Sequence, residues 1–169
     1  MRTTVASLLA VVLAGVVMYG CGGASGGSAP ARAGALSARI ARTTRASAPF
    51  GGLTATRVRI GDQCLHVVVA DTEAEQEEGL RARADLGGYD AMLFRFPGPT
   101  TTAFTMSGTL VPLTIGFYDA AGRRIDGFRM TPCPGDDAGC PVYRARDPFR
   151  YAIETTAERL PAGALVPCG

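Results

Sequence analysis

The stretch TATRVRIGDQCLHVVVA, residues 54–70, decides the fold class of this 169-residue chain. Residues 54–60 and 63–70 are rich in β-branched side chains and alternate in the manner of strands. Gly61 and Asp62, which lie between them, form a pair that favours a tight hairpin turn. We therefore expect an antiparallel β-hairpin at the start of the folded part of the chain.

A short helix is predicted immediately after this hairpin. Thr72 has the character of an N-cap residue, and Glu75, three residues later, completes a capping box. Acidic residues favour the N-terminal half of a helix because of its dipole, and Gly79 is a typical stop. The pattern predicts a helix over about residues 73–78.

The rest of the chain carries strand-like segments separated by Gly and Pro turns, such as Pro97-Gly98-Pro99. Many short strands with turns of this kind predict a β-sandwich or a partly closed barrel. We expect one mostly β domain over residues 54–169. Beyond the hairpin, its strands cover residues 92–96, 101–106, 110–118, 123–130 and 149–155.

The first residues look like a bacterial lipoprotein signal. Arg2 precedes an uncharged apolar stretch, residues 5–20, which ends at Gly20 and is followed by Cys21. A positive start, a short apolar segment and a small residue before the cut are typical of an export signal. We predict a signal peptide over residues 1–20 and a lipid on Cys21, which anchors the protein to the cell membrane on its extracytoplasmic side. A transmembrane anchor and a secreted protein cut elsewhere are the alternatives.

Residues 21–53 are rich in Gly, Ala, Ser and Arg. They lack apolar residues at a sustained helical or strand period, which predicts a disordered tether. Leu36 and Ile40 suit one short helical turn, but no further residue extends that face.

The charge distribution argues against a nucleic-acid partner. Residues 1–61 hold seven of the 17 Arg and no acidic residue, whereas residues 62–169 hold ten Arg and 15 acids. The folded part therefore carries a net charge of −5. Binding to phosphates needs a cationic face, which this balance does not favour.

Four cysteines remain beyond Cys21, and an even number in an exported protein indicates disulfides. Three connectivities are open to four cysteines. Cys133 and Cys140 bracket a short loop that suits one bond, which leaves Cys64 with Cys168 for the other. Zinc sites use C-x-x-C spacings, which the chain lacks, so we expect no metal.

A series of short motifs along residues 58–154 carries a family resemblance. The motifs are Val69–Thr72, Glu78–Leu80 with Arg83, Met92–Phe94 with Phe96, Phe104 with Met106 and Thr109, Pro112-Leu113 with Ile115, Gly122, Met130 with Pro132-Cys133, Tyr143, and Tyr151 with Glu154. In this order and spacing they resemble the family called domain of unknown function 192. The resemblance implies a compact, mostly β, jelly-roll-like domain with one short helix, often exported or lipid-anchored. It implies no reaction and no cofactor.

The chain departs from the family pattern in several places. The family usually has Trp where Thr105 stands, Lys-Asn where Ser107-Gly108 stand, and Asp where Thr114 stands. The Gly expected soon after Glu154 is also missing. Chemistry that rests on that amide and that acid is therefore not expected in this chain.

Catalytic and metal interpretations of the remaining motifs are weaker than structural ones. Cys64 and His66 are two residues apart on a strand, about 7 Å, which is beyond the reach of a nucleophile and its base. Met92 would suit Cu(I), but it lies in register with Phe residues, which indicates core packing. Glu154 shares a strand face with Arg150, so an ion pair explains both.

One side of the segment 110–118 remains as a candidate ligand face. Tyr118 on that side would offer an aromatic surface to a flat or sugar-like ligand. The alternative is that this side is a second buried layer. The predicted site consists of Met106, Thr109, Thr114, Tyr118, Arg150 and Glu154.

We expect a small-molecule or glycan binding module, or an accessory module, of the cell envelope rather than an enzyme. An extracytoplasmic hydrolase and a purely structural envelope protein are the alternatives. The chain has a single His, no phosphate-binding loop and no dinucleotide fingerprint, and no catalytic residue is assigned.

Overall fold

The hairpin predicted over residues 54–70 is present in the computed structural model, which describes residues 29–40, 42–135 and 137–168. Its two strands are β2, Thr54–Ile60, and β3, Gln63–Ala70, and they pair antiparallel. Gly61 turns the chain with a φ of 61°, and any side chain there would collide with the backbone oxygen of Ala162. Both facts require glycine at this turn.

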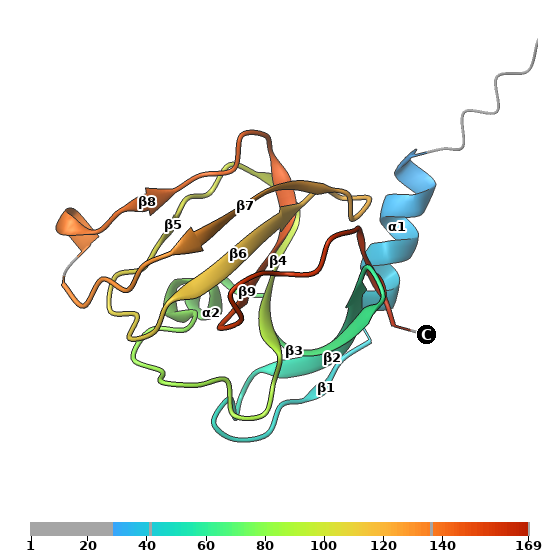
Figure 1. Ribbon diagram of the computed structural model, residues 1–169. Helices are drawn as coiled ribbons and strands as arrows, with labels where there is room; N and C mark the ends of the chain where they lie inside the picture. Colours follow the sequence, from blue (N-terminus) through green and yellow to red (C-terminus); the bar gives the residue numbers. More distant parts are fainter. Residues whose placement is uncertain (1–28, 41, 136, 169) are drawn as a thin grey trace, which may run out of the picture.

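Eight of the described strands form one mixed sheet in the order β1-β2-β3-β4-β9-β6-β7, with β10 pairing with β2 (Figure 1). Strands β3 and β4 are parallel neighbours, and the other pairs in this sheet are antiparallel. Two more strands, β5 and β8, form a separate small sheet. The additional strands are β1 Thr44–Arg45, β4 Ala91–Thr100, β5 Phe104–Thr105, β6 Leu113–Tyr118, β7 Arg124–Met130, β8 Val142–Tyr143, β9 Phe149–Thr155 and β10 Leu165–Pro167.

The strands in the described part of the chain do not close into a barrel. A mostly β, sandwich-like fold with short helices is thereby confirmed. A single 3-10 turn, Asp137–Gly139, precedes β8.

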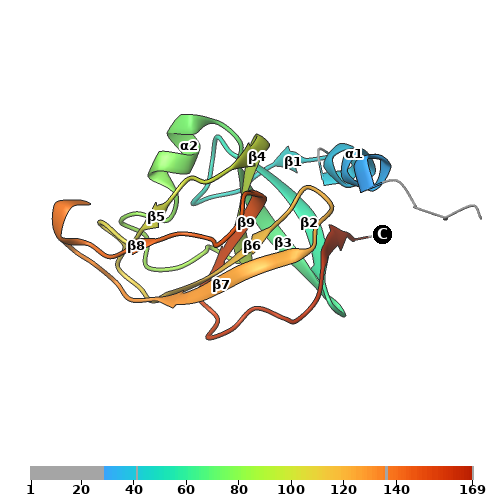
Figure 2. The same ribbon diagram turned by 90° about the horizontal axis from the view of Figure 1, so that it is seen from above.

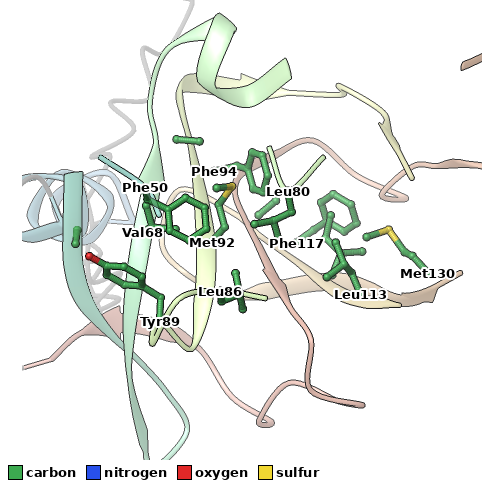
Figure 3. Packing of buried hydrophobic residues seen from close by; sticks show 14 of the residues in the cluster. Phe50, Val68, Leu80, Leu86, Tyr89, Met92, Phe94, Leu113, Phe117 and Met130 are labelled. Carbon is green, nitrogen blue, oxygen red and sulfur yellow. The ribbon is translucent and has the colours of Figure 1, made fainter. Parts of the chain in front are cut away.

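The main sheet is buried on both faces, and each face belongs to a separate apolar cluster. We call the first the aromatic layer, and Figure 3 shows part of its packing. Phe149 meets Phe96 and Phe117 edge to face in this layer. Its largest members are Phe50, Tyr89, Met92, Phe94, Phe96, Leu113, Ile115, Phe117, Met130 and Phe149. The second is the aliphatic layer, formed by Leu36, Ile40, Val58, Ile60, Val67, Val69, Leu93, Tyr118, Tyr151, Ile153, Leu160 and Leu165.

The structure differs from the predicted tether over most of its length. Helix α1, Ala29–Ile40, packs beside β2 and β10 at one end of the sheet (Figure 1). Its Leu36 and Ile40 are buried in the aliphatic layer, with 6% and 0% of their surface exposed. A face of two residues is too short to predict a helix from sequence, and here tertiary packing stabilises it. Residues 21–28, including Cys21, and the predicted signal peptide over residues 1–20 lie outside the described residues.

Helix α2, Glu73–Glu78, occupies the predicted residues and has the predicted capping box. It lies in the connection between the parallel strands β3 and β4. A parallel pair needs such a crossover connection, so the topology itself places this helix beside β4.

Three predicted strand boundaries are wrong. Pro97-Gly98-Pro99 lies inside β4, where the register with β9 shifts between Arg95 and Thr100. Proline is tolerated at such an irregularity because no ladder bond is needed from its nitrogen. The strand predicted over residues 101–106 is reduced to the two residues of β5, and that predicted over 110–118 begins at Leu113.

Both predicted disulfides are present. Cys64 is bonded to Cys168 across 104 residues, and Cys133 to Cys140 across seven. The long bond attaches the C-terminal segment after β10 to the start of β3. Among the residues described, no helix has the length and apolar character needed to cross a membrane.

Candidate functional site

A cavity of about 510 Å³ lies between α2, β4 and the segment that leads into β5. Figure 2 shows α2 beside β4 and over the β5 side of the molecule. The cavity therefore opens on the aromatic layer. It is lined by Asp71, Glu73, Gln76, Glu77, Glu78, Gly79, Leu80, Arg81, Phe94, Phe96, Pro97, Thr102, Ala103, Phe104, Thr105, Thr109 and Glu154.

A capping box and a glycine define the two ends of α2, which borders this pocket. The Thr72 hydroxyl accepts from the Glu75 amide at 3.3 Å, and the Glu75 carboxylate accepts from the amides of Thr72 and Asp71 at 2.9 and 2.7 Å. Burial alone would raise the pKa of Glu75, but these hydrogen bonds lower it below its ordinary value. Gly79 ends the helix with a φ of 49°, a conformation that favours glycine.

Two contacts attach α2 and the end of β3 to β4. The Gln76 amide donates to the Arg95 carbonyl at 3.0 Å. The Arg95 guanidinium forms a bidentate ion pair with Asp71 at 2.5 and 2.6 Å, and both side chains are half-buried. A bidentate pair of this kind fixes orientation as well as distance. The two contacts therefore hold α2 in a defined position relative to β4.

Aromatic rings form the apolar walls. Phe94 and Phe104 pack edge to face with ring centroids 5.1 Å apart, and Phe104 also meets Phe117 at 5.5 Å. Phe104 is half-buried, so part of its ring faces the pocket. Rings held by several neighbours present rigid apolar surface at small entropic cost.

Glu154 is the polar group at the inner end of the pocket. It lies on β9 directly opposite Met92 of β4 and Ile115 of β6, both fully buried. Only 5% of its surface is exposed, and its carboxyl has no hydrogen-bond partner among the described residues. Burial among these apolar neighbours raises the pKa of Glu154 to about 8. At neutral pH the group is mainly a protonated carboxyl, able to donate one hydrogen bond and accept others.

The pocket lining is rich in acids. Asp71 pairs with Arg95, and Glu78 pairs with Arg83 at 2.9 Å. Glu73 and Glu77 are exposed at the mouth. No group of three or more His, Cys, Asp or Glu within the described residues is arranged to hold a metal ion.

Two of the six residues predicted for the ligand face, Thr109 and Glu154, line this pocket together. The structure does not bring the other four to it. Met106 is fully buried in the aromatic layer. The Thr114 hydroxyl donates to the carbonyls of Ala157 and Glu158 at 2.7 and 3.0 Å, so it fixes the segment after β9.

The placements of Tyr118 and Arg150 correct the predicted face. Tyr118 is 0% exposed in the aliphatic layer, so its ring offers no surface to a ligand, and its side of β6 is the second buried layer that we gave as the alternative. Arg150 donates to the Phe96 carbonyl at 3.3 Å and to the Ser37 hydroxyl of α1 at 3.2 Å. No ion pair joins it to Glu154 in the described part of the chain, contrary to the sequence-based explanation of both residues.

Sequence reasoning missed the contribution of α2, Phe94 and Phe104 to the site. The acidic character of residues 73–78 and the apolar rings were both visible, but each has an ordinary explanation taken alone. Their meeting depends on the crossover between β3 and β4 and on the bend that leads into β5. No local sequence pattern predicts that α2, Phe94 and Phe104 lie together.

Comparisons with known proteins agree with the fold. The family model DUF192, described as "Uncharacterized ACR", matches residues 56–166. A protein of unknown function from Novosphingobium aromaticivorans DSM 12444 is 25% identical, with a TM-score of 0.61, over 76% of this chain and 95% of that one. A Sinorhizobium meliloti 1021 protein called a "putative transcription regulator" is 22% identical, with a TM-score of 0.57, over 67% and 93%, and this likeness shows the fold alone. No curated protein matches the sequence.

Proposed function

Because the chain belongs to the uncharacterized DUF192 family, we propose its function from its own pocket: it is a small-molecule-binding module whose ligand lies between α2, β4 and β5. One observation carries this proposal. The Glu154 carboxyl, which is nine-tenths buried and has no partner among the residues that the structure describes, lines a cavity large enough for a small ligand. An unpaired buried polar group costs free energy, and a bound ligand would supply the missing hydrogen bond.

The walls support binding rather than a purely structural role. A structural domain has no need of a cavity with rigid aromatic sides and a polar inner end. Phe94, Phe96 and Phe104 supply area for stacking on a ring, and Thr109 lies in the same lining as Glu154. These features fit a ligand with an apolar or ring-shaped body and at least one polar group, glycans included.

A screen of small molecules and glycans, read by amide chemical shifts, tests this function. The ligand should shift amides of α2, β5 and Thr109. Phe104→Ala and Glu154→Gln should each weaken binding at least tenfold. Phe128→Ala and Glu158→Gln are matched controls outside the pocket lining and should bind like the wild type. A ligand whose shifts map to another surface would refute the proposal.

A second candidate function rests on the same carboxyl. A general acid at neutral pH needs a pKa near 7, and burial moves Glu154 into that range. An extracytoplasmic hydrolase is therefore the alternative to a binding module. Substrate turnover that Glu154→Gln abolishes, while ligand affinity changes little, would favour the enzyme.

We also propose that this module is anchored by a lipid on Cys21 and faces the extracytoplasmic side of the cell membrane. The apolar stretch ending at Gly20-Cys21 supports export. The two disulfides are consistent with an oxidising compartment. Mass spectrometry of the N-terminal peptide from membranes should give a lipid-modified Cys21. A peptide that begins at Met1, or an unmodified Cys21, would refute the anchor.

A further inference from the structure

Resting on the proposed function, we infer that the ligand of this pocket is an organic cation, a protonated amine carried on an apolar body. Three features of the lining carry this inference: an excess of acids, aromatic walls, and a buried carboxyl without a partner. Each feature comes from a different part of the fold. Helix α2 supplies most of the acids, β4 and β5 supply the aromatic rings, and β9 supplies the buried carboxyl.

The balance of charge at the lining disfavours anions. Two of its acids, Asp71 and Glu78, are neutralised by the guanidinium groups of Arg95 and Arg83. The remaining charges of the lining are the exposed Glu73 and Glu77 and one cation, Arg81, so acids still exceed cations. Clefts lined by one sign of charge raise the local concentration of ligands with the opposite sign. A phosphate or carboxylate ligand would be repelled, whereas an amine would be attracted.

The walls suit the same ligand. An ammonium group within about 6 Å of an aromatic ring face is attracted by the ring quadrupole, and this attraction grows when water is excluded. Phe94, Phe96 and Phe104 provide such rings beside Glu154. The apolar body of the ligand would pack on the remaining ring surface and on Leu80.

Glu154 then has a defined role in recognition. In the empty pocket the carboxyl holds its proton. An arriving ammonium stabilises the carboxylate, so the proton leaves to solvent and an ion pair forms in the buried site. A neutral alcohol would behave in the opposite way, because it gains a hydrogen bond from the protonated carboxyl and loses it on deprotonation.

The other charged groups around Glu154 do not reverse this direction. From the end of β3, α2 and the turn after it, the groups that line the same pocket are Asp71, Glu73, Glu77, Glu78 and Arg81. The β4 and β6 residues directly opposite it, Met92 and Ile115, do not titrate. The carboxylates at the mouth attract a cationic ligand.

Three probes of matched shape test the inference: phenylpropylamine, phenylpropanol and phenylpropionate. They are titrated into the whole chain from residue 21, with Cys21→Ser to keep it off membranes, and followed by amide shifts. An alkylamine keeps its charge to about pH 10, as Lys does. We expect the amine to bind at least tenfold more tightly than the alcohol at about pH 8.5. Its affinity should rise roughly 20-fold from about pH 6.5 to about pH 8.5, as Glu154 ionises.

Glu154→Gln should remove both the preference for the amine and its dependence on pH, whereas Glu158→Gln should keep both. An alcohol that binds in the pocket as well as the amine would overturn the inference while leaving the proposed function intact. An amine affinity unchanged by Glu154→Gln would overturn the inference and, with it, the role of Glu154 in the proposed function. If none of the three probes shifts pocket amides, the inference is overturned, and the broader ligand screen then decides the proposed function by itself.

Discussion

The aromatic layer and the aliphatic layer are two faces of one sheet, and they treat a buried polar group differently. Tyr118 and Tyr151 bury their hydroxyls in the aliphatic layer without a hydrogen-bond partner in the described part of the chain. Glu154 buries its carboxyl in the aromatic layer, also without a partner, but beside a cavity. A phenol leaves one hydroxyl unpaired, whereas a protonated carboxyl leaves both a hydroxyl and a carbonyl oxygen unpaired, so the carboxyl costs more to bury. An unpaired phenol is therefore a tolerable packing defect, whereas an unpaired carboxyl next to empty space indicates a place for a ligand.

The segments that pack over the two faces of the sheet explain why the aromatic layer has a cavity. The aliphatic layer lies under α1 and the C-terminal segment, whose Leu36, Ile40, Leu160 and Leu165 fill it. The aromatic layer lies partly under α2, none of whose residues is buried. A polar helix cannot fill the space beneath it, so the cavity remains. The following changes test this contrast, from the largest expected effect to the smallest.

Removing the Cys64–Cys168 bond should have the largest effect, because the bond holds the C-terminal segment whose Leu165 packs in the aliphatic layer. Because this bond closes a loop of 104 residues, its loss as the double Ser variant should lower the free energy of unfolding by about 5 kcal/mol. The Cys133–Cys140 bond closes only seven residues, and its loss should cost about 2 kcal/mol. Urea denaturation measures both. Equal losses would contradict the assigned pairing.

Ile40→Ala tests the docking of α1 on the same side. Ile40 is fully buried although it precedes the first strand. Truncation of a buried Ile in a packed core should lower the free energy of unfolding by about 3 to 4 kcal/mol. Leu110→Ala is the control because Leu110 is 54% exposed, and it should change stability by less than about 0.5 kcal/mol. An Ile40→Ala protein as stable as the control would show that α1 does not pack on the domain in solution.

The pH dependence of stability tests Glu154 in the aromatic layer. Burial raises the pKa of Glu154 from 4.5 to about 8. Between these values the folded protein holds a proton that the unfolded chain has lost, so stability should fall as pH rises, by about 3 kcal/mol from about pH 5 to about pH 8. Glu154→Gln should flatten this slope, which denaturation at a series of pH values will show. A wild-type slope that survives the substitution would assign the titration to another group.

Tyr118→Phe should have the smallest effect and the opposite sign. It removes a buried hydroxyl that has no partner among the described residues and leaves the ring in place. We expect the variant to be more stable by about 1 kcal/mol. Thermal unfolding measures the change. A loss of stability would mean that the hydroxyl has a partner, such as a buried water, and would weaken the contrast between the two layers.

The parts of this fold that were predicted from the sequence depend on local signals. The capping box at Thr72 and Glu75, the turn at Gly61-Asp62 and the strand-forming residues of 149–155 are each complete within a few residues, although Phe149 lies in the aromatic layer and not with Tyr151 in the aliphatic one. The parts that were missed depend on distant partners. Leu36 and Ile40 form too short a face to predict α1 until the sheet lies against them.

The candidate site shows the same division. Alternation along β6 correctly separated two faces, but it cannot tell an exposed face from one covered by a distant segment such as Leu160. Arg150 was assigned to Glu154 because the two share a strand. The docked α1 offers it Ser37 instead, and this leaves Glu154 without a cation. The property that marks Glu154 as functional is therefore a consequence of tertiary structure.

The position of β9 in the sheet has a consequence for the order in which the chain assembles. β9 is among the last strands to be synthesised, yet it lies between β4 and β6 and joins the two halves of the sheet. Contacts between residues far apart in sequence form slowly, because a long loop must close first. A chain that lacks residues 149–155 should therefore remain open to proteolysis even when every earlier strand is present.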